Sequence, residues 1–198
     1  MGEIREPIKS NSIEKKNKII EAGLKVFGKK GYHNTSTPEI AKEAGVSTGI
    51  VYSYFKDKKD IFLQSLNLYF ESLYKPLLKK LNTLKINSYE ETIDSIIELT
   101  MKSHKNHFTA HEEMIAMSHL DEDVHEVFMN VEKGITTKMV ECLKKNGIVK
   151  ENLKEKVHIA YNMVENLCHE FVYHKHDFID YETMINETKK LLLFLLNN

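Results

Sequence analysis

The sequence predicts an all-α protein, with a small N-terminal domain of three helices and a larger helical bundle behind it. Apolar residues recur every three or four positions through most of the 198-residue chain, which is the period of an amphipathic helix. Only 8 glycines and 3 prolines are present, too few for the many turns of an all-β fold. Residues that cap helices stand before most of the periodic segments.

The composition narrows the class of protein. Hydrophobic residues make up 41% of the chain and charged residues 29%, which is typical of a globular protein. The longest apolar run, Leu191–Leu196, is too short to span a bilayer, and the polar first residues predict no signal peptide. Cys142 and Cys168 lie within helical patterns, which favours reduced core thiols over a disulfide. We therefore expect a cytoplasmic protein without a membrane segment.

The first helix is expected to begin at Asn11 or Ser12 and to end at Gly31, which can adopt the left-handed conformation of a helix C-terminus. Tyr32 is expected to pack back against this helix. Its predicted apolar stripe consists of Ile13, Ile20, Leu24 and Phe27.

Two short helices follow, joined by a tight turn. Thr37 can cap the first of them, and Pro38 suits its first turn. Gly45 can end that helix, and Ser47 can cap the next one, which carries Val51 inward. Short helices joined through a glycine turn form a helix-turn-helix unit, here at about residues 36–55.

Helices alone are predicted beyond this unit. Asp57 can cap a fourth helix, and Pro76 is expected to end or kink it near Leu73 to Lys75. This position is either a flexible joint or a plain helix end. Later helices are predicted to start at the capping signals Ser88, Thr109, Asp121 or Asp123, Asn152 and Asp180.

The helix-turn-helix stretch also carries a family resemblance. Its pattern is Ile40-Ala41-x-x-Ala44-Gly45-Val46-Ser47-x-Gly49-x-x-Tyr52-x-Tyr54-Phe55-x-x-Lys58, which resembles the DNA-binding domain of the TetR family of transcriptional regulators. The resemblance covers roughly the first third of the chain. It implies a DNA-binding domain at residues 13–73 and a helical ligand-binding and dimerisation domain at residues 74–198. The implied function is a ligand-responsive repressor that binds a pseudo-palindromic operator in double-stranded DNA as a homodimer.

The charge distribution agrees with binding of phosphates at one end of the chain. Residues 1–60 hold 12 Lys and Arg against 8 Asp and Glu, a net charge of +4, whereas the rest holds 16 against 21, a net charge of −5. The start of the second short helix is expected to face base edges in the major groove. The residues of this group are Ser47, Thr48, Gly49, Ile50 and Ser53.

The resemblance assigns four further residues to DNA phosphates. They are Thr37, Tyr52, Tyr54 and Lys58. The alternative is that one of the two tyrosines packs in the domain core, and the pattern favours Tyr52 for that place. Ser53 departs from the aromatic residue that is frequent in the family.

Wide apolar faces near the chain end predict a homodimer, because a lone monomer would expose part of that area. The alternative is a buried monomeric core. The residues expected at the dimer interface are Val164, Leu167, Phe171, Leu191 and Leu195.

The second domain is rich in Met and aromatic residues, which can line a pocket for a small apolar or amphipathic effector. The residues expected to line it are Met101, Phe108, Met114, Met117, Phe128, Tyr161 and Glu165. Ordinary core packing is the alternative for each of them.

Histidines raise a second interpretation, a helical metal-binding protein or enzyme. His104, His107 and His111 follow helical spacing, but Thr109 predicts a helix start between them, and no nucleophile stands beside a base. We therefore expect no catalytic residue, no cofactor and no metal, and leave open whether the histidine cluster binds a metal ion.

Overall fold

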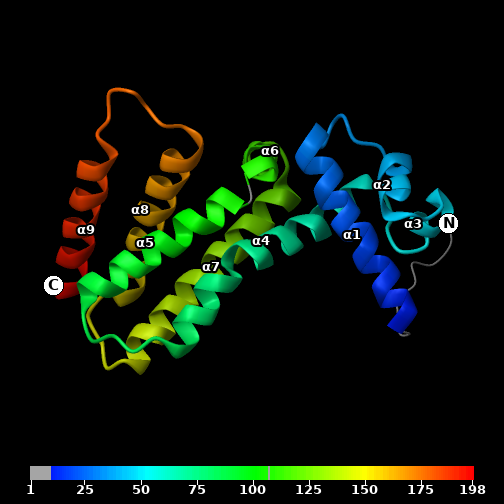
Figure 1. The fold of residues 1–198 in the computed structure, drawn as a ribbon. Helices are drawn as coiled ribbons and strands as arrows, with labels where there is room; N and C mark the ends of the chain where they lie inside the picture. Colours follow the sequence, from blue (N-terminus) through cyan, green and yellow to red (C-terminus); the bar gives the residue numbers. More distant parts are fainter. Residues whose placement is uncertain (1–9, 107) are drawn as a thin grey trace. The chain divides into compact units, whose positions relative to one another are not determined.

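The computed structural model describes residues 10–106 and 108–198, and these residues form helices and no strands (Figure 1). The all-α prediction is therefore confirmed. The helices are α1 (Ser10–Lys30), α2 (Thr37–Ala44), α3 (Thr48–Tyr52), α4 (Lys58–Thr83), α5 (Tyr89–Asn106), α6 (Phe108–Ser118), α7 (Glu122–Lys145), α8 (Leu153–Tyr173) and α9 (Tyr181–Asn197).

Several of the predicted helix boundaries match the structure. Gly31, Gly45 and Gly147 have φ of 79°, 69° and 80° at the ends of α1, α2 and α7, the left-handed conformation that glycine adopts without steric cost. The carboxylate of Asp180 accepts hydrogen bonds from the backbone N–H groups of Glu182 and Thr183, and it therefore caps α9.

Two boundary predictions are wrong. Ser36, not Thr37, is the N-cap of α2, so Thr37 is the first residue inside the helix. The helix end expected near Pro76 is also absent, because α4 continues through this residue to Thr83. Pro76 is exposed, while Tyr74, Leu77 and Leu81 on the opposite face are buried and hold the helix in place.

The chain divides into two compact units, which differ from the division at residues 73 and 74 expected from the sequence. The first unit comprises residues up to Ser72 together with Thr109–Met129, and the second comprises Leu73–Phe108 and Asn130–Asn198. In the first unit, Lys59 at the start of α4 pairs with Asp121 (2.8 Å) and Asp123 (2.6 Å) before and within α7. Residues 109–129 therefore pack with the N-terminal helices.

The core of the first unit is aromatic and aliphatic. The ring of Phe27 meets that of Phe62 edge-on at 5.0 Å, and Tyr32 stacks on Phe27 at 5.9 Å, as expected from the sequence. The apolar stripe of α1 differs from the predicted one, because Ile13 is exposed. The buried residues of α1 are Ile19, Ala22, Gly23, Val26 and Phe27.

The second unit is built around α5, α8 and α9, which pack on one another. Its core cluster consists of Ile93, Ile97, Val164, Leu167, Cys168 and Leu192. Both cysteines of the chain are buried free thiols. None of the helices formed by the described residues is long and apolar enough to cross a membrane.

Candidate functional site

The turn between α2 and α3 is fixed by local hydrogen bonds. The Glu39 carboxylate accepts from the backbone N–H of Ser36 (2.9 Å) and from its hydroxyl (2.8 Å), which ties down the start of α2. Contacts with Lys30 and Ser36 lower the pKa of Glu39 to about 2. The Ser47 hydroxyl accepts from the Ile50 N–H at 3.4 Å and caps α3 as predicted.

Helix α3 presents its first residues to solvent. Ser47 and Gly49 are exposed, and Thr48 and Ile50 are half-buried, while Val51 is fully buried against the unit's core. The residues predicted to read base edges therefore lie on the accessible side of α3. Ser53 is half-buried, and its hydroxyl donates to the Ile50 carbonyl at 2.7 Å.

The sequence pattern favoured Tyr52 over Tyr54 as the tyrosine that packs in the domain core, and the structure shows the reverse. Tyr52 is 52% exposed, whereas Tyr54 is 9% exposed and its hydroxyl hydrogen-bonds that of Ser12 at 3.3 Å. Tyr54 is the one that packs in the core. Spacing alone could not decide between them, because the turn after Tyr52 leaves the helical period.

The side chains of Lys58 and Thr37 both pack within the first unit, where Lys58 is half-buried and Thr37 is buried. The Lys58 ammonium donates to the Tyr32 carbonyl at 2.7 Å and lies 4.3 Å from the centre of the Tyr32 ring. Thr37 is only 6% exposed. Their side chains therefore help to position α2 and α4, a role that the sequence pattern did not indicate.

Two other lysines are better placed for phosphates. Lys42 in α2 and Lys56 after α3 are exposed, and neither forms an ion pair with a residue that the structure describes. By contrast, Lys25 and Lys30 pair with Glu43 and Glu39. Lys42 and Lys56 were not predicted from the sequence, although their positions in and beside the two short helices are a signal for them.

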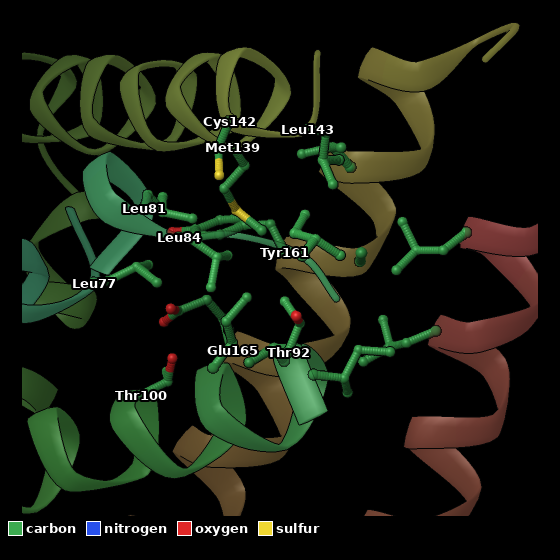
Figure 2. Close-up of a pocket in the computed structure, with 18 residues that line it drawn as sticks. Leu77, Leu81, Leu84, Thr92, Thr100, Met139, Cys142, Leu143, Tyr161 and Glu165 are labelled. Carbon is green, nitrogen blue, oxygen red and sulfur yellow. The ribbon is translucent and has the colours of Figure 1, made fainter. Parts of the chain in front are cut away.

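An apolar cavity that is partly open to solvent lies within the second unit (Figure 2). It is lined almost entirely by apolar side chains of α4, α5, α7, α8 and α9. Its labelled lining residues are Leu77, Leu81, Leu84, Thr92, Thr100, Met139, Cys142, Leu143, Tyr161 and Glu165.

Among the predicted ligand-binding residues whose side chains the structure describes, Tyr161 and Glu165 line this cavity and the others do not. Burial raises the pKa of the Tyr161 hydroxyl, and the charge of Glu165 adds to the effect. The other predicted residues lie elsewhere. Met114, Met117 and Phe128 belong to the first unit, where the ring of Phe128 meets that of Phe70 edge-on at 4.7 Å. Met101 packs on the core formed by α5, α8 and α9. The side chain of Phe108 is outside the described residues.

The predicted interface residues separate into two groups. Val164 (8% exposed) and Leu167 (2% exposed) face the core of their own unit and are not available to a partner. Leu191 is 55% exposed, Phe171 and Leu195 are half-buried, and Phe194, which the prediction omitted, is 65% exposed.

His104 and His111 lie in different helices, which agrees with the helix start expected between them. His104 is in α5, His111 is in α6, and His107 lies outside the described residues. His104 Nε2 lies 3.1 Å from a Glu165 carboxylate oxygen, and His111 Nδ1 hydrogen-bonds the Tyr69 hydroxyl. Both rings therefore have partners within their own units.

Helices α1, α2 and α3 form a three-helix domain, which we call the head. Within it, α2, the glycine turn and the exposed α3 form a helix-turn-helix unit, so the protein is of the helix-turn-helix class. Residues 19–64 match the family described as bacterial regulatory proteins, tetR family. Residues 19–64 therefore form a DNA-binding domain of the tetR family type.

Similar proteins support this assignment. The chain is 45% identical over 65 residues to the uncharacterized HTH-type transcriptional regulator YuxN of Bacillus subtilis, a match that covers 33% of this chain and 22% of YuxN. It is 47% identical over 45 residues to the fatty acid metabolism regulator protein of the same organism, covering 23% of each. The chain thus spans less than a quarter of the length of these two relatives, both of which are named as regulators and not as enzymes.

A solved structure from Syntrophomonas wolfei, assigned to the TetR family, shares the fold over nearly the whole chain. Its TM-score is 0.70 at 21% identity, over 94% of this chain and 96% of that one. The likeness beyond residue 64 is therefore one of fold.

Proposed function

We propose that the protein is a cytoplasmic, dimeric transcriptional regulator that represses by occupying a pseudo-palindromic operator and is released by a small effector. The observation that carries the proposal is that the first residues of α3 are accessible to solvent, while Val51 on the other side of the same helix is buried in the core of the first unit. A helix held in this way can enter the major groove with its N-terminal side chains first.

The chemistry of α3 suits a modest, largely apolar readout. Thr48 and Ile50 offer methyl groups that can contact thymine methyls, and Gly49 lets the backbone approach the bases closely. Based on their exposure in the structure, we assign the side chains of Tyr52, Lys42 and Lys56 to contacts with DNA phosphates.

Apolar exposure on α9 supports the homodimer. Leu191 and Phe194 are one helical turn apart and expose more than half of their surface. Full burial of a fully exposed side chain of this kind contributes about 1.5–3 kcal/mol, so burial of the surface that these two residues still expose would contribute roughly half as much each. Leu195 and Phe171, both half-buried, remain in the proposed interface, and Val164 and Leu167 leave it.

The cavity of the second unit supports the effector. It is concave, apolar and formed by side chains from five helices, as is usual for small-molecule sites. Binding there can shift the protein away from the DNA-binding state only if the effector prefers the released state, and that preference is what the proposal assigns to it.

Selection of bound fragments from the host's genomic DNA tests the regulator. We expect recovery of a few sequences with two related half-sites about one helical turn (~34–36 Å) apart. A Thr48→Ala variant should lose about 0.8 kcal/mol of preference for the selected site over a scrambled duplex, the value of one buried methyl group, while an exposed control variant, Lys144→Ala, should not. Recovery of random fragments would overturn the proposal.

Salt dependence tests the phosphate contacts. Replacing Lys56 by Ala should lower the slope of log affinity against log salt by roughly 1. The family pattern described from the sequence predicts the same decrease in slope for Lys58→Ala. Because its ammonium is bonded to Tyr32, we expect Lys58→Ala to lower the melting temperature as well, and an unchanged slope would remove Lys58 from the interface.

A further inference from the structure

We propose that the effector is an apolar molecule with a single cationic head group, an alkylamine in chemical class, and that Glu165 receives this head group. The inference rests on the effector cavity of the proposed function and adds the charge of the ligand to it. The observations that carry it are the charge of the lining, the free side of the Glu165 carboxylate and the surroundings of its oxygen atoms.

Glu165 is the only acidic or basic residue among the 18 that line the cavity. The remaining lining is aliphatic, apart from Met139, Cys142, Tyr161 and two threonines. No lysine, arginine or histidine is among these residues. A ligand with an apolar body therefore finds partners everywhere, whereas an anionic head group finds no cation.

The carboxylate of Glu165 has one oxygen to spare. Its Oε2 lies 3.1 Å from His104 Nε2, which approaches from a second, smaller cavity beside the large one. Its Oε1 accepts no hydrogen bond from any residue within the described part of the chain, and the side chain is 19% exposed. Figure 2 shows the oxygens of Glu165 and Thr100 on the same side of the cavity.

The other polar groups compete poorly for a head group. The Tyr161 hydroxyl is already bonded to that of Tyr74 at 2.8 Å. Burial, and after it the negative charge of Glu165, raises the pKa of the Cys168 thiol behind the lining. Burial, the larger of the two causes, penalises any charge that lacks a partner, and the Glu165 carboxylate offers a partner only to a cation.

A buried ion needs a partner of opposite charge, because transfer out of water without one is costly. A carboxylate such as that of a fatty acid would meet Glu165 as a like charge, and a protonated amine would meet it as an ion pair. The fatty acid metabolism regulator protein matches this chain over 45 residues, 23% of each, so its printed name does not carry over to the cavity.

Calorimetric titration with three probes of equal chain length tests the inference. The probes are n-decylamine, n-decanol and decanoate at pH 7, where an alkylamine is protonated as a lysine side chain is. The proteins are the full chain, Glu165→Gln, which keeps an oxygen that can accept from His104, and Glu155→Gln, an exposed control at the start of the same helix.

We expect the amine to bind the unaltered protein and Glu155→Gln roughly tenfold or more tightly than the alcohol, since hydrogen bonds to charged groups are the strong ones. Decanoate should bind most weakly. Glu165→Gln should bring the amine to within about twofold of the alcohol while leaving alcohol binding unchanged.

Equal or tighter binding of decanoate or decanol would overturn the cationic ligand and leave the cavity as an effector site. No binding of any probe would overturn the inference together with the effector site. DNA binding by the head is measured separately and is unaffected by either outcome.

Discussion

Gly23 lies where α1 contacts α4, and it shows how tightly the head is assembled. A Cβ at this position would lie 2.7 Å from Ser65 Oγ and 2.8 Å from Ile61 Cγ2. Ser65 has little freedom to move, because it is buried and its hydroxyl donates to the Ile20 carbonyl at 3.0 Å. The absence of a side chain at residue 23 therefore permits the contact between the two helices.

The first prediction follows from this contact. Gly23→Ala should destabilise the protein by about 1–3 kcal/mol through overpacking, measured by urea or thermal unfolding. Gly134→Ala is the matched control, since a Cβ there meets nothing within 4 Å. The control should gain about 0.5–1 kcal/mol in α7. Equal effects of both substitutions would show that the α1–α4 contact is not tight.

Glu39 gives a prediction about pH. Its pKa in the folded protein is lowered to about 2, first by Lys30 and then by Ser36, from an ordinary value of 4.5. A lowered pKa means that the carboxylate stabilises the fold above about pH 4.5 and that this contribution disappears as the pH falls towards 2. Glu39→Gln should therefore weaken the decline in melting temperature between these values.

The control for this experiment is Glu21→Gln, an exposed glutamate on α1. Its melting temperature should follow that of the unaltered protein across the acid range. If Glu39→Gln gives the same acid profile as the unaltered protein, the Lys30 and Ser36 contacts do not stabilise the carboxylate in solution.

At the scale of the elements, α3 and the turn after it decide which side chains can reach DNA. The side chain of Tyr52 is exposed on the surface of the head, whereas that of Tyr54 is buried in its core. Tyr52→Phe should therefore weaken operator binding by about 0.5–1.5 kcal/mol, the usual net contribution of a hydrogen bond. Tyr54→Phe should leave operator affinity unchanged within about twofold.

Fluorescence anisotropy with a labelled operator measures both variants. The salt slope of the two proteins should remain that of the unaltered protein, since neither substitution removes a charge. A larger loss from Tyr54→Phe than from Tyr52→Phe would restore the assignment made from the family pattern.

The helices themselves could be predicted because their signals are local. Capping residues, glycines at helix ends and apolar periodicity mark α1, α2, α3 and α9 within a few residues. Pro76 misled the prediction, because buried neighbours on the other face of α4 preserve the helix. Propensity is a weak preference that tertiary packing overrides.

The candidate sites were predicted only in part, for a different reason. Periodicity identifies an apolar face but not the neighbour that covers it, so Val164 and Leu167 looked like interface residues and are core residues. The cavity combines residues from five helices far apart in the sequence. Tyr161 was predicted as one of the aromatic residues of the second domain and Glu165 as a polar group among them, signals that Leu77 or Ile96 does not give.

At the scale of the whole molecule, the account requires two subunits. A Leu191→Asp, Phe194→Asp double variant should run as a monomer in sedimentation velocity, because two exposed apolar side chains on α9 become charged. Val149→Asp is the control, since Val149 is equally apolar and exposed but lies in a loop. A double variant that remains a dimer would place the interface elsewhere.

The central claim is that two heads of one dimer read two half-sites on the same side of the duplex. Affinity for the selected operator, compared with a version that carries about half a helical turn (~5 base pairs) of additional spacer, tests it most directly. The account predicts one dimer per operator and a fall to the affinity of random duplex on insertion. Unchanged affinity, or saturation by single subunits, would contradict it.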